Sequence, residues 1–488
     1  MKRLSTGLAD LDLILGGGME RGSTVVFAGP PGSGKTILAQ QMCFASGTVE
    51  HKAVYYTTLS EPHSKLVEHL CDFAFFDPQA LGPEVEYVHL GDMLRGPGAV
   101  DLSLLVGEVV RKSVEEEPVL MVIDSTKMLR DFSSDHALRS ALYDLTSRVA
   151  HSGAVLLLLG EYTTEEMQTR ADFTLADAIV HLTYQPREPV DRRTLRVAKM
   201  RGAIHLNGAH TAQITSDGFQ VYPRVESLLP DDVPPKDGRI PTGIAGLDPL
   251  LAGGIPDSDA TLVLGPSGVG KTVGCLNFIA EGLARGERCL YMTFQDTVGE
   301  VVAMAGRYGW DFSAARGSDQ LMVSHVPVGE LELDVLAAVV RHRLTDGTTT
   351  RVVIDGLAEM AATARETERF PAYLRSILGV VRASSASLWV TSATNTFGAI
   401  GEPLAGLMYL FHNVIQLRYI EHCAELGRAL NVVKMHSSRH DQAMHTCHIT
   451  DHGLTIGDPL ERVTGMLGGS PLRDCPTTSG ANDTGTGN

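Results

Sequence analysis

The chain has 488 residues, and at roughly 150 residues per domain this length predicts two to four domains, each able to bury its own core. Apolar residues make up 43% and charged residues 20% of the sequence, so a chain that is disordered throughout is excluded. The net charge of -17 disfavours binding to nucleic acids and to acidic membrane surfaces. The seven cysteines show no CxxC spacing, and no segment is long and apolar enough to span a membrane. We therefore expect a cytoplasmic protein without disulfides, a zinc site or a membrane span.

A long segment near the N-terminus recurs in the second half of the chain. RLSTGLADLDLILGGGMERGSTVVFAGPPGSGKT (3–36) matches RIPTGIAGLDPLLAGGIPDSDATLVLGPSGVGKT (239–272) at 15 of 34 positions. Shorter matches follow in the same order: Tyr55–Glu61 with Leu290–Asp296, Asp124 with Asp355, and 195–202 with 430–437. The repeat predicts one domain that has been duplicated.

The composition between and after the two copies marks the domain boundaries. The segment VESLLPDDVPPKDGR (225–239) is rich in Pro and Asp, which is typical of an exposed linker. The last residues are rich in Ser, Thr, Gly and Asn, which is typical of a disordered tail. The prediction is a first domain over 1–225, a linker over 226–238, a second domain over 239–469 and a tail over 470–488.

Short apolar runs alternate with longer helical patterns within each copy. In the first copy these runs are 23–29, 53–59, 118–124 and 154–160. Such apolar runs indicate strands of a mainly parallel sheet that helices cover on both faces. After residue 178 the pattern alternates and is interrupted by turn residues, as expected of antiparallel strands. Each copy is therefore predicted to be an α/β domain whose C-terminal strands are antiparallel.

Each copy contains one phosphate-binding loop, GPPGSGKT (29–36) or GPSGVGKT (265–272), between a predicted strand and a predicted helix. Glycines allow the backbone N–H groups to face the phosphates, the lysine reaches the β- and γ-phosphates, and the threonine hydroxyl binds Mg²⁺. The cofactors expected are ATP and Mg²⁺, with Thr36 and Thr272 as metal ligands. The expected nucleotide-binding residues are Gly29, Gly32, Ser33, Gly34, Lys35 and Thr36 in the first copy, and Gly265, Gly268, Val269, Gly270, Lys271 and Thr272 in the second.

Acidic residues follow two of the predicted strands in each copy. Asp124 and Asp355 end apolar runs, where a carboxylate reaches the shell of a bound Mg²⁺. Glu61 and Asp296 come just after the second strand and are candidates for the group that activates the attacking water. The alternative is that these acids are turn, capping or surface residues.

The chain resembles the KaiC family of the RecA-like ATPase superfamily over roughly residues 2–470. The resemblance rests on TGLADLD (6–12), both phosphate-binding loops, RTLRVAKMRGAIHLNG (193–208) and RALNVVKMHSSRHD (428–441). It implies two tandem RecA-like P-loop NTPase domains and a homo-hexameric double ring in which each ATP lies between neighbouring subunits.

The resemblance also assigns cations that reach the γ-phosphate of the adjacent subunit. In the first copy these are Lys199 and Arg201, which could alternatively form only a solvated cationic edge. In the second copy Lys434 is retained, but His436 takes the place of the arginine and does not supply the fixed charge of a guanidinium. We therefore expect the second copy to bind ATP better than it hydrolyses ATP.

Other positions depart from the family pattern. The family places two adjacent glutamates after the second strand, where this chain has Ser60–Glu61 and Gln295–Asp296. Clock members phosphorylate a Ser-Thr pair in the second copy, where this chain has Met408–Tyr409. Autophosphorylation is therefore not expected as the main function.

The function expected is slow ATP hydrolysis by the first copy of a hexamer, while the second copy serves as a nucleotide-dependent structural or signalling ring. A regulatory protein partner is expected, but the sequence does not identify it. One alternative is a DNA-directed motor or recombinase, which requires basic, aromatic-bearing loops. Another is a scaffold whose ATP joins subunits without being hydrolysed.

Overall fold

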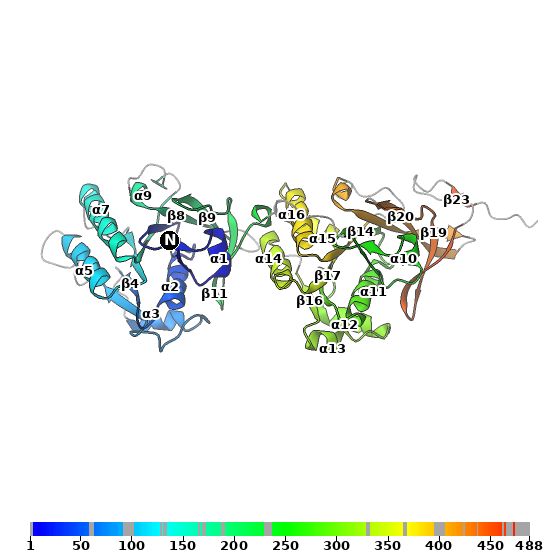
Figure 1. Ribbon diagram of the computed structural model, residues 1–488, viewed down its shortest axis with the longest axis horizontal. Helices are drawn as coiled ribbons and strands as arrows, with labels where there is room; N and C mark the ends of the chain where they lie inside the picture. Colours follow the sequence, from blue (N-terminus) through cyan, green and yellow to red (C-terminus); the bar gives the residue numbers. More distant parts are fainter. Residues whose placement is uncertain are drawn as a thin grey trace, which may run out of the picture. The chain divides into compact units, whose positions relative to one another are not determined.

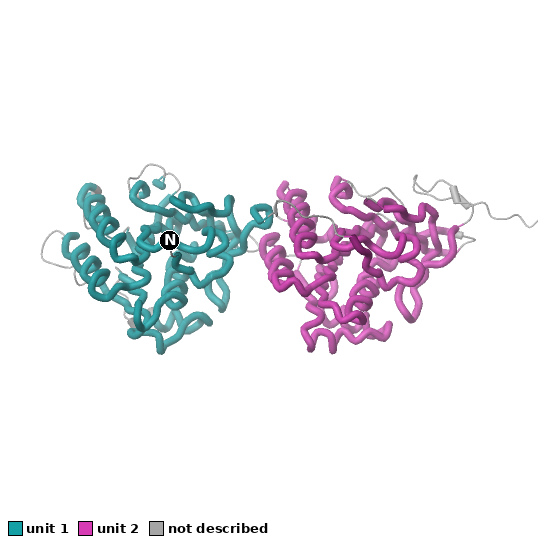
Figure 2. Tube along the Cα trace, in the orientation of Figure 1, with its two compact units in different colours: residues 1–228 teal, residues 229–488 magenta. Residues whose placement is uncertain are grey.

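The computed structural model describes residues 3–57, 63–90, 102–126, 129, 134–163, 166–167, 172–186, 191–228, 237–327, 332–364, 368–394, 406–422, 425–436, 438–460, 463–464 and 472–473. The chain divides into two compact units, residues 1–228 and 229–488 (Figure 2). The short helix η1 (Val225–Ser227) closes the described part of unit 1, and the side chain of Val225 is buried. Most of the predicted linker and almost all of the predicted tail lie outside the described residues, so those bounds stay predictions.

Unit 1 is built on a nine-stranded sheet (Figure 1). The neighbours from β5 to β8 run parallel, whereas β9, β10 and β11 continue the sheet in antiparallel fashion. Across the sheet the strands are β11 (Gly218–Tyr222), β10 (His210–Thr215), β9 (Arg192–Met200), β8 (Ala178–Gln185), β3 (Thr24–Ala28), β7 (Val155–Gly160), β6 (Leu120–Asp124), β4 (Ala53–Thr57) and β5 (Val85–His89).

The central strand β3 shows why these strands are so apolar. Val25 and Phe27 enter one buried cluster together with residues of α2 (Lys35–Ser46). Val26 enters a second cluster with residues of α5 (Leu102–Glu115) and α7 (Asp135–Ser152) on the other face. Because side chains alternate between the faces of a strand, both faces of β3 are covered by helices. The remaining elements of unit 1 are β1 (Arg3–Leu4), β2 (Met19–Glu20), α1 (Ala9–Ile14), α3 (His63–Leu70) and α9 (Asp172–Leu175).

Unit 2 repeats this arrangement with a second nine-stranded sheet of the same order. Its strands are β16 (Leu321–His325), β15 (Arg288–Thr293), β17 (Thr349–Asp355), β18 (Ser387–Ala393), β14 (Ala260–Gly265), β19 (Asn413–His422), β20 (Glu425–Met435), β21 (His445–Thr450) and β22 (Gly453–Pro459). Its helices are α10 (Leu247–Leu250), α11 (Lys271–Ala284), α12 (Val298–Arg307), α13 (Phe312–Gly317), α14 (Leu333–Leu344), α15 (Leu357–Thr363), α16 (Phe370–Ala383) and η3 (Met408–Leu410). Short pairs are β12 (Arg239–Ile240) with β13 (Ile255–Pro256), and β23 (Val463–Thr464) with β24 (Leu472–Arg473). The predicted fold class is confirmed in both units.

The strand register corrects one equivalence between the copies. Thr57 pairs with Asp124 across β4 and β6, and Thr293 pairs with Asp355 across β15 and β17. Tyr55 therefore corresponds to Tyr291, two residues before the threonine in each copy, and not to Leu290 as the sequence match predicted. Neighbouring residues of this strand are all apolar, so the sequence alone does not reveal that the alignment of the two copies is shifted by one residue.

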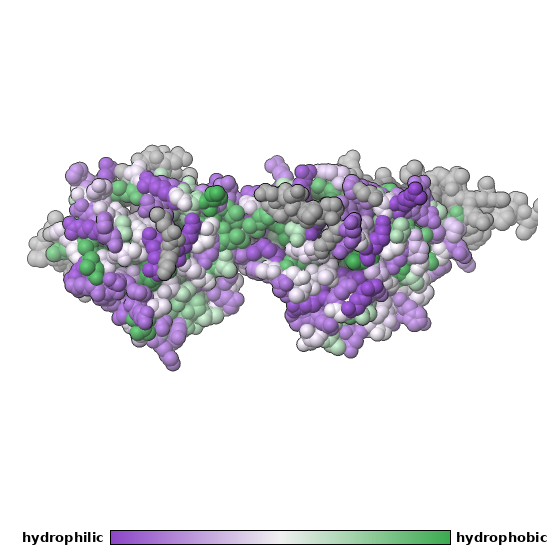
Figure 3. Space-filling view, in the orientation of Figure 1, coloured by the Kyte–Doolittle hydropathy of each residue, from purple (hydrophilic) through white to green (hydrophobic). Residues whose placement is uncertain are grey.

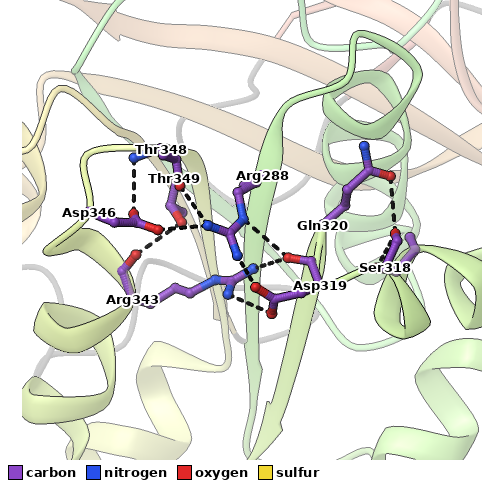
Figure 4. A network of polar contacts seen from close by, with 9 residues as sticks. Arg288, Ser318, Asp319, Gln320, Arg343, Asp346, Thr348 and Thr349 are labelled. Carbon is purple, nitrogen blue, oxygen red and sulfur yellow. Dashed lines mark hydrogen bonds and ion pairs between the residues drawn. The ribbon is translucent and has the colours of Figure 1, made fainter.

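Two arginines of unit 2 join segments that are far apart in the sequence. Arg351 of β17 is fully buried and donates to the Glu287 carboxylate and to the carbonyls of Pro241 and Phe278. Arg288, at the start of β15, bonds both Asp319 and Asp346, which belong to the turns before β16 and β17 (Figure 4). This second network is solvent-exposed and lies at the amino ends of the parallel strands, so each ion pair contributes at most about 1 kcal/mol.

The surface of unit 2 is mainly hydrophilic or weakly polar on the face drawn in Figure 3. In the described part of the chain, every helix is too short or too polar to cross a lipid bilayer.

Candidate functional site

The phosphate-binding loop of unit 1 joins β3 to α2 at the carboxyl edge of the parallel strands. Lys35 is the first residue of the helix, and its ammonium group donates to the carbonyls of Gly29 and Pro30, both at 2.9 Å. Gly34 adopts a left-handed φ of 94°, and a Cβ there would lie 2.8 Å from the ring of Phe219. A glycine is therefore required for the turn and for the close packing of the sheet against the loop.

The corresponding loop of unit 2 joins β14 to α11. The Lys271 ammonium group donates to the carbonyls of Gly265 and Pro266, both at 2.8 Å. Burial lowers the pKa of Lys271, and the negative charges of Asp355 and Glu359 partly oppose that shift. Gly270 has a φ of 116°, which again favours glycine.

Other loop residues predicted to bind nucleotide have clear positions. The Ser33 hydroxyl lies 3.4 Å from the Lys35 ammonium group. Gly32 and Gly268 take left-handed φ angles of 75° and 76°. The side chain of Val269 is fully buried in the core of unit 2, so only its backbone is available to a phosphate.

Asp124 lies at the end of β6 beside the loop of unit 1. Its carboxylate accepts from the Thr36 hydroxyl at 2.9 Å and from the Tyr55 hydroxyl at 2.6 Å. Because Thr36 donates its proton to Asp124, the lone pairs of its oxygen remain available to a cation. This pair of oxygen ligands fits Mg²⁺, which takes few protein ligands and completes its shell with phosphates and water. The described residues contain no group of three or more His, Cys, Asp or Glu side chains that could hold a metal ion.

Asp355 occupies the same place in unit 2, at the end of β17. It accepts from the Tyr291 hydroxyl at 2.7 Å and from the Thr391 hydroxyl of β18. Sequence reasoning missed both tyrosines, because an aromatic residue inside an apolar strand looks like an ordinary core residue. The one sequence feature that could have identified them is that a tyrosine stands at the equivalent position of both copies.

Unit 2 has a cavity of about 330 Å³ at the carboxyl edge of its sheet. Asp296 lines it, and burial together with the negative charge of Asp355 raises the pKa of the Asp296 carboxyl group. Glu61, which the sequence match predicted as the counterpart of Asp296, lies outside the described residues; continued without a gap, the offset between Thr57 and Thr293 aligns Asp296 with Ser60 instead. The cavity is lined by Ser267, Gly268, Gly270, Lys271, Thr272, Val273, Thr293, Gln295, Asp296, Asp355, Gly356, Glu359, Thr391, Ala393 and Ile449.

Lys199 and Arg201 lie at the opposite edge of the sheet in unit 1. Lys199 pairs with Ile179, near the start of β8, and donates to the carbonyls of Phe173 and Thr174 at 3.1 and 3.3 Å. Arg201 donates to the Thr174 carbonyl at 3.3 Å. Burial and the nearby charge of Arg201 lower the pKa of Lys199. The structure therefore brings the two cations together but separates them from the phosphate-binding loop of their own unit.

The corresponding residues of unit 2 have the same placement. Lys434 pairs with Val414 near the start of β19 and donates to the Phe411 carbonyl at 2.7 Å. His436 follows β20, and its backbone N–H donates to the carbonyl of His412. This edge is again opposite to the cavity of about 330 Å³.

Comparisons with known proteins cover both units. A family model described as "ATPase: KaiC" matches residues 4–226 and 240–461. "Circadian clock oscillator protein KaiC" of Picosynechococcus sp. is 26% identical over 97% of this chain and 93% of that protein. "Circadian clock protein KaiC3" of Synechocystis sp. is 26% identical over 97% of this chain and 95% of that protein. A KaiC oscillator protein of Acaryochloris marina is 23% identical over 96% and 91% of the two chains.

Proposed function

The chain belongs to the KaiC family of ATPases, and we propose that it binds ATP with Mg²⁺ in both units and hydrolyses ATP to ADP and phosphate mainly in unit 1. The sites are completed at the interfaces between the subunits of a hexamer. The protein acts as a nucleotide-dependent regulatory ATPase in the cytoplasm.

One observation supports this proposal above the others. In each unit the phosphate-binding loop is at the carboxyl edge of the sheet. Lys199 and Lys434, which occupy matching positions in the two copies, are at the amino edge. About three residues of strand, or roughly 10 Å, separate these levels in unit 1. A lysine at the amino edge does not contact phosphates bound to the loop of its own unit. In a ring of subunits, the same lysine would face the nucleotide of the adjacent subunit.

Different residues of unit 1 are assigned to different steps of ATP hydrolysis. Lys35 and the backbone of the loop would hold the β- and γ-phosphates, and Thr36 and Asp124 would hold Mg²⁺, which would neutralise charge on the phosphate oxygens. Glu61 accepts a proton from the water that attacks the γ-phosphorus, and the bond to the β-phosphate oxygen breaks. Lys199 and Arg201 of the adjacent subunit stabilise the charge of the transition state.

Unit 2 has a different balance of groups. His436 replaces an arginine, so the site lacks a permanently charged guanidinium beside Lys434. We therefore assign unit 2 to ATP binding and slow turnover, with its nucleotide state read by a regulatory protein. Met408 and Tyr409 stand where clock members have Ser and Thr, so autophosphorylation is not part of this proposal.

The test is to measure phosphate release and oligomer mass, with and without ATP, for the intact chain and for Lys35→Ala and Lys271→Ala. We expect Lys35→Ala to lower turnover at least tenfold, because the loop lysine contacts the transferred phosphoryl group. We expect Lys271→Ala to keep most turnover but to weaken the ATP-dependent hexamer. Turnover that follows Lys271 would contradict the proposed division.

Two further results favour the alternatives. ATP-dependent assembly without any phosphate release indicates the scaffold. Salt-dependent binding of single-stranded DNA at micromolar protein indicates the DNA-directed motor.

A further inference from the structure

The cavity of unit 2 contains a carboxylate that no motif predicted. Glu359, in the first turn of α15, lies four residues after Asp355 and lines the same cavity as Lys271 and Asp296. Its Oε1 accepts a hydrogen bond of 2.5 Å from the side-chain amide of Gln295, which follows β15. The amide thus fixes the orientation of a carboxylate beside the site of the phosphates.

Besides Asp355, two acids line this cavity, Asp296 and Glu359, and their carboxylates are held differently. In the described part of the chain, no donor reaches the Asp296 carboxylate; the backbone N–H of Asp296 donates to the Thr293 hydroxyl instead. Glu359, in contrast, is oriented by Gln295. A base that is itself oriented by a third group is the arrangement that activates a nucleophile effectively.

This feature is specific to unit 2. The residue four places after Asp124 in unit 1 is Met128, so unit 1 has no carboxylate at the matching position of its sequence. Glu359 is therefore not a residue that the two copies share, and the duplication does not explain its presence. A purely structural alternative exists, because an acid in the first turn stabilises the N-terminus of a helix. That role predicts a change in stability, not in turnover.

We propose that Glu359 is the water-activating carboxylate of unit 2 and that Gln295 is its positioning residue. This inference rests on the proposed function, since it requires that unit 2 binds ATP with Mg²⁺. Glu359 takes a proton from water as the water oxygen bonds to the γ-phosphorus. The bond between the γ-phosphorus and the bridging oxygen breaks, ADP keeps that electron pair, and the proton passes from Glu359 to solvent.

The experiment uses the full chain with Lys35→Ala, so that phosphate release reports on unit 2. The added changes are Glu359→Gln, Gln295→Leu and Asp296→Asn, with exposed Glu368→Gln as the matched control. Bound ATP per chain, kcat, KM and the thermal midpoint are measured for each variant.

We expect Glu359→Gln to lower kcat at least tenfold, with KM and bound ATP within about twofold. Gln295→Leu lowers kcat about three- to tenfold without changing KM, because the carboxylate is present but less well oriented. Asp296→Asn lowers kcat less than threefold, and Glu368→Gln leaves it unchanged. If Glu359→Gln unfolds, Glu359→Asp keeps the charge with a shorter reach and is expected to retain only part of kcat.

The opposite outcomes are distinct. A Glu359→Gln variant that shifts only the thermal midpoint, or an Asp296→Asn variant that alone removes turnover, overturns the inference. ATP bound by the Lys35→Ala chain without phosphate release also overturns it, while hydrolysis by unit 1 stands. Failure of that chain to bind ATP refutes the proposed function of unit 2 itself.

Discussion

Single residues of the two sites show how each aspartate is held. Tyr55 and Tyr291 donate to Asp124 and Asp355 from the neighbouring strand. Burial, followed by the charge of the aspartate, raises the pKa of each tyrosine well above its usual range. Both hydroxyls therefore stay protonated and act as permanent donors that orient the carboxylate.

The first prediction concerns the hydroxyl of Tyr55. Tyr55→Phe removes a donor to Asp124, so we expect the Mg²⁺ concentration for half-maximal ATP hydrolysis to rise about tenfold, as is common when support for a metal ligand is lost. Stability should fall by about 1 kcal/mol. The control is Tyr56→Phe, because the Tyr56 hydroxyl is buried without a hydrogen-bond partner among the described residues. Equal Mg²⁺ dependence in the two variants would refute the role of Tyr55.

A second prediction follows from the raised pKa of Asp296. The folded state binds this proton more tightly than the unfolded chain, so the stabilisation is complete below the ordinary pKa of 3.8 and is lost as pH rises through the folded-state value. The ionised carboxylate therefore destabilises unit 2 at neutral pH. We expect Asp296→Asn to raise the thermal midpoint at pH 7.5 without ATP, and the gain to shrink toward pH 4. The matched control substitution is Asp458→Asn at an exposed position, and a pH-independent effect of Asp296→Asn would be inconsistent with this origin.

At the scale of strands and helices, sequence patterns identified the sheets and the positions of Lys35 and Asp124 at element ends. Apolar periodicity reports burial, and a phosphate-binding loop has a fixed spacing, so both are visible in a single sequence. Glu359 was not predicted, because a lone acid in the pattern LAEM looks like a helix-surface residue. Only the fold brings Gln295, from another strand end, within hydrogen-bonding distance of it.

The burial of Arg351 was also not predictable from the sequence pattern. The third prediction concerns this residue. It precedes the apolar run of β17 and looks like an exposed strand end, yet it is fully buried against Glu287 and two carbonyls. Arg351→Met removes the charge that pairs with Glu287 and the donor to both carbonyls, so unit 2 should lose about 3–5 kcal/mol in a denaturant titration. Arg285→Met removes an exposed ion pair with Glu281 and should cost less than about 0.5 kcal/mol. Similar losses for the two variants would contradict this account of the buried network.

At the scale of the whole molecule, duplication keeps two sheets of the same order while their sites diverge. The acid beside the phosphates is predicted at Glu61 in unit 1, after the second strand, and is proposed at Glu359 in unit 2, on the helix after Asp355. The cations on the amino edge also differ, with Arg201 in one unit and His436 in the other. The proposed difference in turnover between the two sites rests on these few side chains, because a common fold does not by itself determine the chemistry of a site.

The final prediction tests whether unit 1 is completed by a neighbouring subunit. Lys35→Ala chains lack an effective loop but keep Arg201, whereas Arg201→Ala chains keep the loop but lack the guanidinium, so each alone should lose most hydrolysis by unit 1. In an equal, random co-assembly, about one quarter of the interfaces combine an intact loop with an intact Arg201. Phosphate release should therefore recover to about that fraction of the intact rate. Lys35→Ala chains mixed with a Lys35→Ala/Arg201→Ala double variant contain no intact loop and should not recover. If native mass measurements prove mixed hexamers and turnover still fails to recover, the cations act within their own chain, and the amino-edge placement of Lys199 and Arg201 needs another explanation.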